Sequence, residues 1–275
     1  MELNLLTLEE TATLRNLLSH ATHIVICAHK SPDGDAIGSS LAWMHYLKQT
    51  GKTDVRVCMP DATPDFLHWL PGHNSVIRYD RRPREVEKML PVIRQAMRGT
   101  IAVLGNHDYT EYIKGNPKEK AAQEARLIAV EEKLLGWTLL RNQNTVITSS
   151  GGDSIYICGT ENDGRPPFPN YSDYRNATKG IGRKAFVIML QHDPSAWRRN
   201  VLPKTRAQLT LCGHTHGGQM QLFGWRPTSI RQHEDYGLYR QGERCLYVTA
   251  GLGGLVPFRL NMPNEIAVIT LHTKK

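Results

Sequence analysis

Residues 209–216 read Leu209-Thr-Leu-Cys-Gly-His-Thr-His216, a short apolar run that leads into two histidines. Two earlier segments have the same design, Val103-Leu-Gly-Asn-His-Asp108 and Val187-Ile-Met-Leu-Gln-His-Asp193. In each, a run typical of a buried strand ends at polar side chains. Because strand ends in an α/β sheet meet at one edge, we expect these side chains to lie together.

The residue types at these three strand ends are those of a metal site. Imidazole nitrogens and an amide oxygen are good ligands for Mn, Fe or Zn. His214 and His216 stand two residues apart, and both can reach a pair of metal ions if a tight turn follows the strand. Gly213 is expected to let the backbone come close at that turn. A lone histidine at a strand end is usually structural, so the prediction depends on all three segments together.

The remainder of the second part alternates between helical and extended patterns. We expect a helix over residues 117–135, and a loop rich in Pro, Asn and Tyr over residues 161–175. A loop of that length is a candidate substrate wall. Strands are predicted over residues 100–104, 145–148, 154–158, 185–190, 208–212, 244–249 and 265–271.

The first part of the chain contains one β-α-β unit. A helix is predicted over residues 7–20, where Thr7 and Glu10 form a capping box. A strand over residues 23–28, a helix over 36–49 and a strand over 54–59 follow, so a parallel pair with a crossover helix is expected. The composition changes near residue 90, which divides the chain into domains of residues 1–90 and 91–275.

A second candidate metal site follows the first strand of the β-α-β unit, in the segment His29-Lys-Ser-Pro-Asp33-Gly-Asp35. Two carboxylates two residues apart, with a histidine four residues before the first, can bind a divalent ion. The helix that follows adds an N-terminus that favours an anion. The alternative is an acidic turn in which Asp35 caps the helix.

Composition favours a folded protein with an uneven charge. Forty per cent of the residues are hydrophobic, and the net charge is +8. Residues 1–90 hold 10 Lys+Arg against 11 Asp+Glu, and residues 91–275 hold 24 against 15. A basic surface suits anionic partners, including nucleic acid, although a solvated surface explains it as well. The acidic N-terminus does not read as a signal peptide, and no apolar run approaches the ~18–20 residues of a membrane span. Scattered cysteines without C-x-x-C spacing suggest free thiols in a reducing compartment. Because no signal peptide or membrane span is predicted, a cytoplasmic location is expected.

The three strand-end motifs, in this order, resemble those of the calcineurin-like metallophosphoesterases over residues 91–275. The tail, with Gly217-Gly-Gln219, Leu246–Gly253 and Pro257-Phe-Arg259, looks like a bacterial subgroup of that family that is often membrane-associated. The resemblance implies an αββα sandwich and two divalent ions that activate water. It implies one metal held by Asn106, His192 and His214, and a second held by His216. It also implies that His107 stabilises the phosphoryl group or protonates the leaving oxygen, with Asp108 orienting it; Asp108 and Asp193 could instead be turn residues.

Two elements of the metallophosphoesterase pattern are missing. The family begins with a strand ending in Asp-x-His and continues with a Gly-Asp whose carboxylate bridges the metals. This chain has no Asp-x-His before Gly105, and the Gly34-Asp35 pair stands in a different context. The second metal therefore keeps one protein ligand, which puts two-metal catalysis in question.

The segment from His29 to Ser40 resembles the first motif of DHH-family phosphoesterases, the group with oligoribonucleases and phosphoadenosine phosphatases. The resemblance covers residues 10–90, including Pro64-Asp-Phe-Leu-His-Trp-Leu-Pro71. It implies that His29, Asp33 and Asp35 are metal ligands. The Asp-His-His signature and the C-terminal substrate domain of that family are absent from the sequence.

Together these patterns predict an α/β chain in which a truncated DHH-like, Rossmann-type fragment precedes a partial metallophosphoesterase sandwich. The predicted function is metal-dependent hydrolysis of phosphate mono- or diesters with Mn, Fe, Zn or Mg. The alternative is an inactive protein that binds metal, phosphate or nucleic acid. Loss of central strands would expose apolar faces, so self-association is expected. Asp33 or Asp35 could also replace the missing bridge beside His216.

Overall fold

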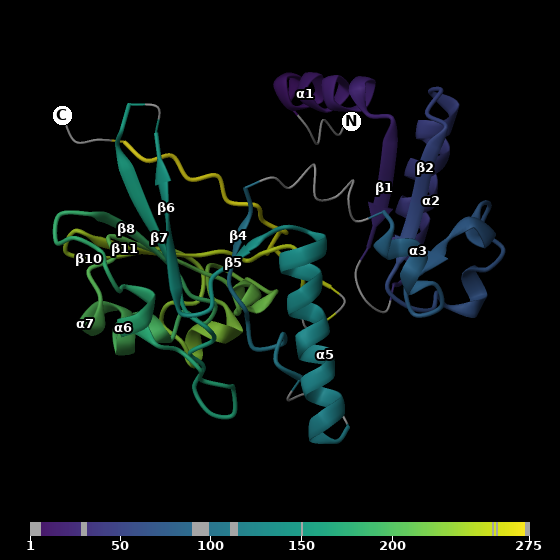
Figure 1. The fold of residues 1–275 in the computed structure, drawn as a ribbon. Coiled ribbons are helices and arrows are strands. Elements are labelled where there is room, and N and C mark those ends of the chain that lie inside the picture. The colour runs from purple at the N-terminus through teal and green to yellow at the C-terminus, as the bar shows by residue number, and fades with distance from the viewer. Residues whose placement is uncertain are drawn as a thin grey trace. The chain divides into compact units, whose positions relative to one another are not determined.

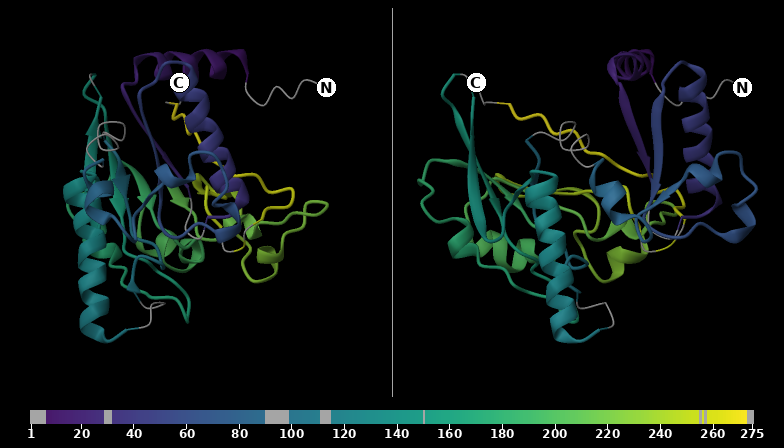
Figure 2. Two further views of the ribbon diagram at one scale, coloured as in Figure 1. Left: turned by 90° about the vertical axis from the view of Figure 1, so that its right-hand side faces the viewer. Right: turned by 45° about the vertical axis from the view of Figure 1, so that its right-hand side comes forward.

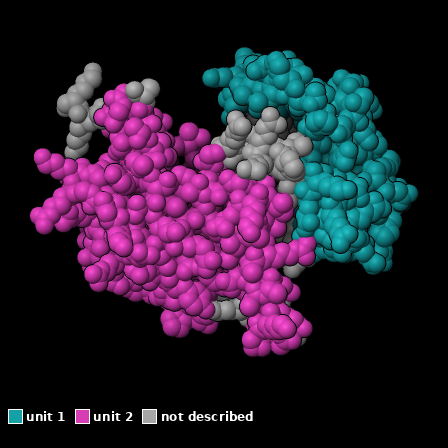
Figure 3. Space-filling model, in the orientation of Figure 1, with its two compact units in different colours: residues 1–97 teal, residues 98–275 magenta. Residues whose placement is uncertain are grey.

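The computed structural model describes residues 7–28, 32–89, 99–110, 115–149, 151–254, 256 and 258–272. The chain divides into two compact units, Met1–Met97 and Arg98–Lys275 (Figure 3). We call them unit 1 and unit 2 and describe each by itself.

Unit 1 is built on a β-α-β core. Helix α1 (Leu8–His20) begins at the predicted capping box of Thr7 and Glu10. Strands β1 (His23–Cys27) and β2 (Asp54–Met59) pair in parallel, and α2 (Gly34–Gln49) connects them. The predicted crossover unit is therefore confirmed, and Figure 2 shows α2 beside these strands from two sides. Its apolar face packs on β2 through buried side chains, namely Ile37, Leu41, Met44, Leu47, Val55 and Val57.

A short third strand completes the sheet of unit 1. Strand β3 (Ile77–Arg78) pairs in parallel with the end of β2, which gives the order β1-β2-β3. The connection from β2 contains the 3₁₀ turns η1 (Asp65–Leu67) and η2 (His73–Ser75), and α3 (Pro83–Glu87) follows β3.

Unit 2 is dominated by a six-stranded mixed sheet with the order β10-β11-β9-β8-β7-β6 (Figure 1). Strands β7, β8, β9 and β11 run parallel, while β6 and β10 pair antiparallel at the two edges. The six strands are β6 (Gln143–Thr148), β7 (Ser154–Gly159), β8 (Phe186–Leu190), β9 (Leu209–Cys212), β10 (Gly237–Gln241) and β11 (Arg244–Val248).

Unit 2 is built of four layers of helices and strands. Helix α6 (Tyr174–Ala177), the π-helix η5 (Trp197–Val201) and α7 (Leu202–Lys204) belong to the core on one sheet face. The other face packs against the pair β4 (Ile101–Ala102) and β5 (Thr138–Leu139). Behind that pair lies α5 (Pro117–Ala129), which continues as the π-helix η4 (Val130–Leu134) and contributes Ile128 to a further cluster. The alternation of faces along the strands therefore produces an αββα arrangement.

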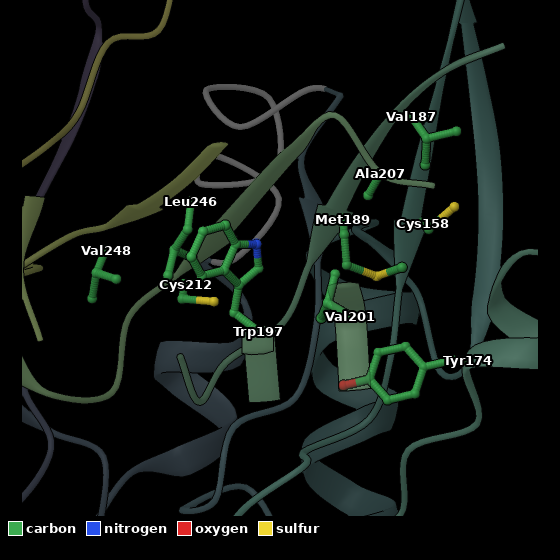
Figure 4. Packing of buried hydrophobic residues seen from close by; sticks show 10 residues of the cluster. All are labelled: Cys158, Tyr174, Val187, Met189, Trp197, Val201, Ala207, Cys212, Leu246 and Val248. Atoms are coloured by element: carbon green, nitrogen blue, oxygen red, sulfur yellow. The ribbon is translucent and has the colours of Figure 1, made fainter. Parts of the chain in front are cut away.

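The larger core of unit 2 is closely packed around Trp197, which is 1% exposed (Figure 4). Its neighbours come from β7, β8, β9 and β11 on the same sheet face, and from the helical segments that cover it. They are Cys158, Tyr174, Val187, Met189, Val201, Ala207, Cys212, Leu246 and Val248. This core fixes β8 and β9, whose ends carry two of the three polar motifs.

The predicted strand over residues 265–271 is wrong. The backbone there runs without strand pairing, although the sequence Ile-Ala-Val-Ile-Thr-Leu is rich in β-formers. Ile266 and Val268 are 77% and 91% exposed. High β-propensity makes a strand only where a neighbouring backbone supplies hydrogen bonds. For the same reason the strand predicted over residues 100–104 shortens to the two residues of β4.

Candidate metal centre

Three donor atoms from three different loops converge at the carboxyl ends of β4, β8 and β9. The distance from Asn106 Oδ1 to His192 Nε2 is 2.9 Å, and that to His214 Nδ1 is 3.0 Å. The two imidazole nitrogens are 3.3 Å apart. We call these residues the Asn-His-His cluster. The structure brings together the three side chains that the sequence assigned to one metal.

The spacing of the Asn-His-His cluster fits one metal ion. Separations of 2.9–3.3 Å are short enough for all three donor atoms to bind one ion at bond lengths of about 2.1 Å. Asn106 is 2% exposed, so its amide oxygen is held inside the protein.

Gly105 makes room for this arrangement. A Cβ at residue 105 would stand 2.7 Å from the ring of His192, closer than side chains tolerate. The glycine is therefore required for His192 to reach Asn106. Gly213, which we expected to permit a close backbone approach, has open space where a Cβ would lie.

Burial keeps the histidines of the cluster in the form that binds metals. Burial, together with the neighbouring charges of His214, His216 and His107, lowers the pKa of His192 to about 3. Burial also lowers the pKa of His214, against the opposing effect of Asp193, whose Oδ2 lies 3.8 Å from Nε2. Neutral imidazole is the ligating form, so the cluster needs no deprotonation at neutral pH.

The turn that carries His214 and His216 is held in an unusual conformation. Both histidines have positive φ, 71° and 53°. The hydroxyl of Thr215 between them donates to the carbonyl of Asp235 at 2.5 Å. The carboxylate of Asp235 is fully buried and accepts two hydrogen bonds from Arg226, both at 2.8 Å. These contacts stabilise backbone angles that non-glycine residues adopt at a cost.

His216 lies near the cluster. Burial lowers its pKa, and the charges of Arg259, His214 and His107 add to that effect. Arg259 donates to the carbonyls of Ala250, Gly251 and Gly253, and to that of His216 at 3.5 Å. The tail that the sequence singled out thus packs directly behind the turn.

Asp108 closes the loop of the first motif. Its Oδ2 accepts the backbone N–H of Gly105 at 2.6 Å, which is the turn role that the sequence left as an alternative. Burial raises the pKa of Asp108, while the N–H of Gly105 and the charge of His107 oppose that shift. Asp193 also closes a turn, since its Oδ1 accepts the N–H of Ser195 at 2.8 Å.

The candidate ligands of unit 1 have a clear structural role at one position. Asp33 is the N-cap of α2, and its Oδ1 accepts the N–H of Ala36 at 2.9 Å. The alternative reading had assigned the cap to Asp35, which instead lies exposed in the first turn of the helix. His29 lies outside the described residues.

Among the residues that the structure describes, no three His, Cys, Asp or Glu side chains gather into a metal site. The Asn-His-His cluster has two histidines, and its third donor is an amide. Within the described ranges, no helix has both the length and the apolar character needed to cross a bilayer.

Sequence reasoning missed the buried acids that hold the loops of the site. Asp163 and Asp235 are both 0% exposed, and Glu265 accepts from Thr249 and from the backbone of Ala250. The loop around Asp163 supplies only two of its four side-chain partners, Asn170 and Tyr174, and the other two, Arg199 and Asn200, lie 36 and 37 residues away. Asp235 and Glu265 follow no recognisable motif.

Comparisons with known proteins agree with both resemblances. The model of the DHH family, N-terminal domain, matches residues 23–208, from β1 past residue 90 into unit 2. The Bacillus subtilis protein YkuE, an uncharacterized metallophosphoesterase, is 29% identical over 195 residues, which are 68% of this chain and 62% of that protein. The Escherichia coli phosphodiesterase YaeI is 30% identical over 180 residues, 62% of this chain and 58% of that protein. This chain thus spans about six tenths of these relatives.

The solved structure of an exopolyphosphatase-related protein from Bacteroides fragilis is 20% identical to this chain, with a TM-score of 0.28. The match covers 73% of this chain and 37% of the Bacteroides fragilis chain. A TM-score this low establishes no common fold. The match to more than half of the chain, together with the relatives, identifies the protein: it belongs to the DHH family and is related in sequence to the metallophosphoesterases.

Proposed function

We propose that this protein is a metal-dependent phosphoesterase whose centre is the Asn-His-His cluster. The observation that carries the proposal is the convergence of three uncharged donors within 2.9–3.3 Å of one another. A divalent Mn, Fe, Zn or Mg ion bound there would neutralise charge on a phosphoryl oxygen and activate water. The names of the relatives, metallophosphoesterase and phosphodiesterase, support a phosphate-ester substrate.

The residues around the cluster have distinct roles in this proposal. His107 lies close enough to influence His192, His214 and His216 electrostatically, which suits a group that contacts the phosphoryl oxygen or protonates the leaving group. Asp108 holds the loop of His107 through Gly105. His216 would serve a second ion. Asp33 and Asp35, with His29, remain proposed ligands of a separate site in unit 1.

The test combines metal affinity and turnover in the full chain. Mn²⁺ binding is measured by calorimetry, and hydrolysis is followed with an aryl phosphodiester. Loss of a supporting residue typically costs 10–100-fold in metal affinity, so His214→Ala, which removes a direct donor, should cost at least about 100-fold. His107→Ala should abolish turnover and leave Mn²⁺ binding intact. His233→Ala is the matched control, because that side chain is 78% exposed.

A second candidate is a protein that binds metal or phosphate without hydrolysis. The observation that favours it is the lack of a third His, Cys, Asp or Glu ligand in any group of described side chains. It predicts Mn²⁺ binding that depends on His214 and no turnover above that of the variants. Full turnover in His214→Ala would contradict both candidates. Steeply salt-dependent binding of RNA would support a nucleic-acid role instead.

A further inference from the structure

The loop over residues 161–175 is fastened from within by one buried acid. The carboxylate of Asp163 accepts hydrogen bonds from Asn170, Tyr174, Arg199 and Asn200, at 2.6–2.8 Å. Arg199 also donates to the carbonyl of Asp163 at 2.8 Å. Such charge-assisted bonds are shorter and stronger than neutral ones, so this loop is a rigid part of unit 2.

The tip of the loop is folded to one conformation. The carbonyl of Pro169 accepts from the side chain of Asn162 at 2.6 Å and from the N–H of Gly164 at 3.0 Å. The N–H of Phe168 donates to the carbonyl of Arg165 at 2.8 Å. A Cβ at Gly164 would stand 2.4 Å from that of Phe168, so only glycine permits the position of Phe168.

Phe168 is thereby placed against the candidate metal centre. Its ring meets that of His214 edge to face, with centroids 4.9 Å apart and planes at 88°. Phe168 is only half-buried, so part of the ring remains accessible to a ligand. Phe168 therefore forms an apolar wall beside the polar donors of the Asn-His-His cluster.

We infer that Phe168 determines specificity, by binding an aromatic or other apolar group attached to the phosphorus centre of the ligand. The inference rests on the proposed function, because it takes the Asn-His-His cluster as the place of the phosphoryl group. Binding sites of this kind combine apolar walls with a few placed polar groups. An aromatic pair adds about two- to tenfold in affinity beyond area burial.

The experiment compares phenylphosphonate with methylphosphonate, by calorimetry on the full chain in saturating Mn²⁺. The phosphonate group is the same in both probes, so the ratio of their affinities measures the contribution of the apolar wall formed by Phe168. The wild-type chain should bind phenylphosphonate about two- to tenfold more tightly. Phe168→Ala should reduce this ratio to about one, and Phe168→Tyr should retain it. Phe223→Ala is the control, because that ring is fully exposed.

An unchanged ratio in Phe168→Ala overturns the inference, as does equal binding of the two probes by the wild type or no binding of either. Circular dichroism spectra of the variants show whether each is folded, and loss of the ratio in a folded Phe168→Tyr variant, which keeps the ring, would also overturn the inference. Hydrolysis is followed in the same samples. A phenyl preference that depends on Phe168 without any turnover would support the inference and refute the proposed hydrolysis.

Discussion

Replacing Asp163 by alanine should destabilise unit 2 strongly. The carboxylate is 0% exposed, and its two oxygens accept four side-chain hydrogen bonds. Its removal leaves the guanidinium of Arg199 without its acidic partner. The side-chain donors of Asn170, Tyr174 and Asn200 also lose their acceptor. Breaking a buried ion pair from one side costs about 3–5 kcal/mol.

This magnitude translates into a measurable shift in urea denaturation. With a slope of about 2 kcal/mol per M, the midpoint should fall by about 1.5–2.5 M. Tryptophan fluorescence is a suitable signal, because Trp197 lies in the core of the same unit. Asp163→Asn retains the shape and part of the acceptor capacity, so its midpoint should lie between those of the alanine variant and the wild type. Asp153→Ala, at an exposed position in the hairpin after β6, is the control. An Asp163→Ala midpoint within 0.3 M of the wild type would refute the reasoning.

Three further perturbations test other parts of the structure. Burial, with the charges of Asp108 and Glu132, raises the pKa of Glu131 to about 7 from 4.5, so the free energy of unfolding should fall as the pH rises between these values. Glu131→Gln should therefore raise the free energy of unfolding by about 1–2 kcal/mol at pH 8 and leave it unchanged at pH 4. Melting temperatures measured at both pH values check this. Leu246→Ala should cost about 2–5 kcal/mol because the side chain is 0% exposed, whereas Leu238→Ala, at 54% exposure, should cost far less in the same denaturation assay. Asp33→Ala should cost about 1 kcal/mol through loss of the α2 cap, and an equal loss in Asp35→Ala would show that the cap is not the cause.

Most of the fold could be predicted from the sequence because its patterns are local. The capping box at Thr7 and the apolar face of α2 depend on neighbours three or four residues away. The predicted strands that form, such as β7, β8 and β9, each lie beside another strand that supplies the backbone hydrogen bonds. The segment 265–271 has the same composition and no strand neighbour, so propensity alone misleads there. The two-residue strands β3 and β5 are too short to show a period.

The site was predictable where chemistry and topology coincide. Asn106, His192 and His214 each follow a strand; β8 and β9 are neighbours in one sheet, whereas β4 belongs to the separate pair that packs against it. The acids that hold the surrounding loops could not be read from the sequence, since the partners of Asp163 lie up to 37 residues away. Phe168 was within the loop singled out as a substrate wall, but its contact with His214 depends on the fold of the loop tip.

We propose that Asn106, His192 and His214 hold one divalent ion. The most direct measurement is pulsed electron paramagnetic resonance of the full chain loaded with Mn²⁺, which detects nitrogen nuclei bonded to the metal. The proposed site predicts coupling to two imidazole nitrogens in the wild type, retained in His233→Ala and lost when both His192 and His214 are replaced by alanine. A Mn²⁺ spectrum without nitrogen coupling, or one unchanged in the double variant, would contradict it.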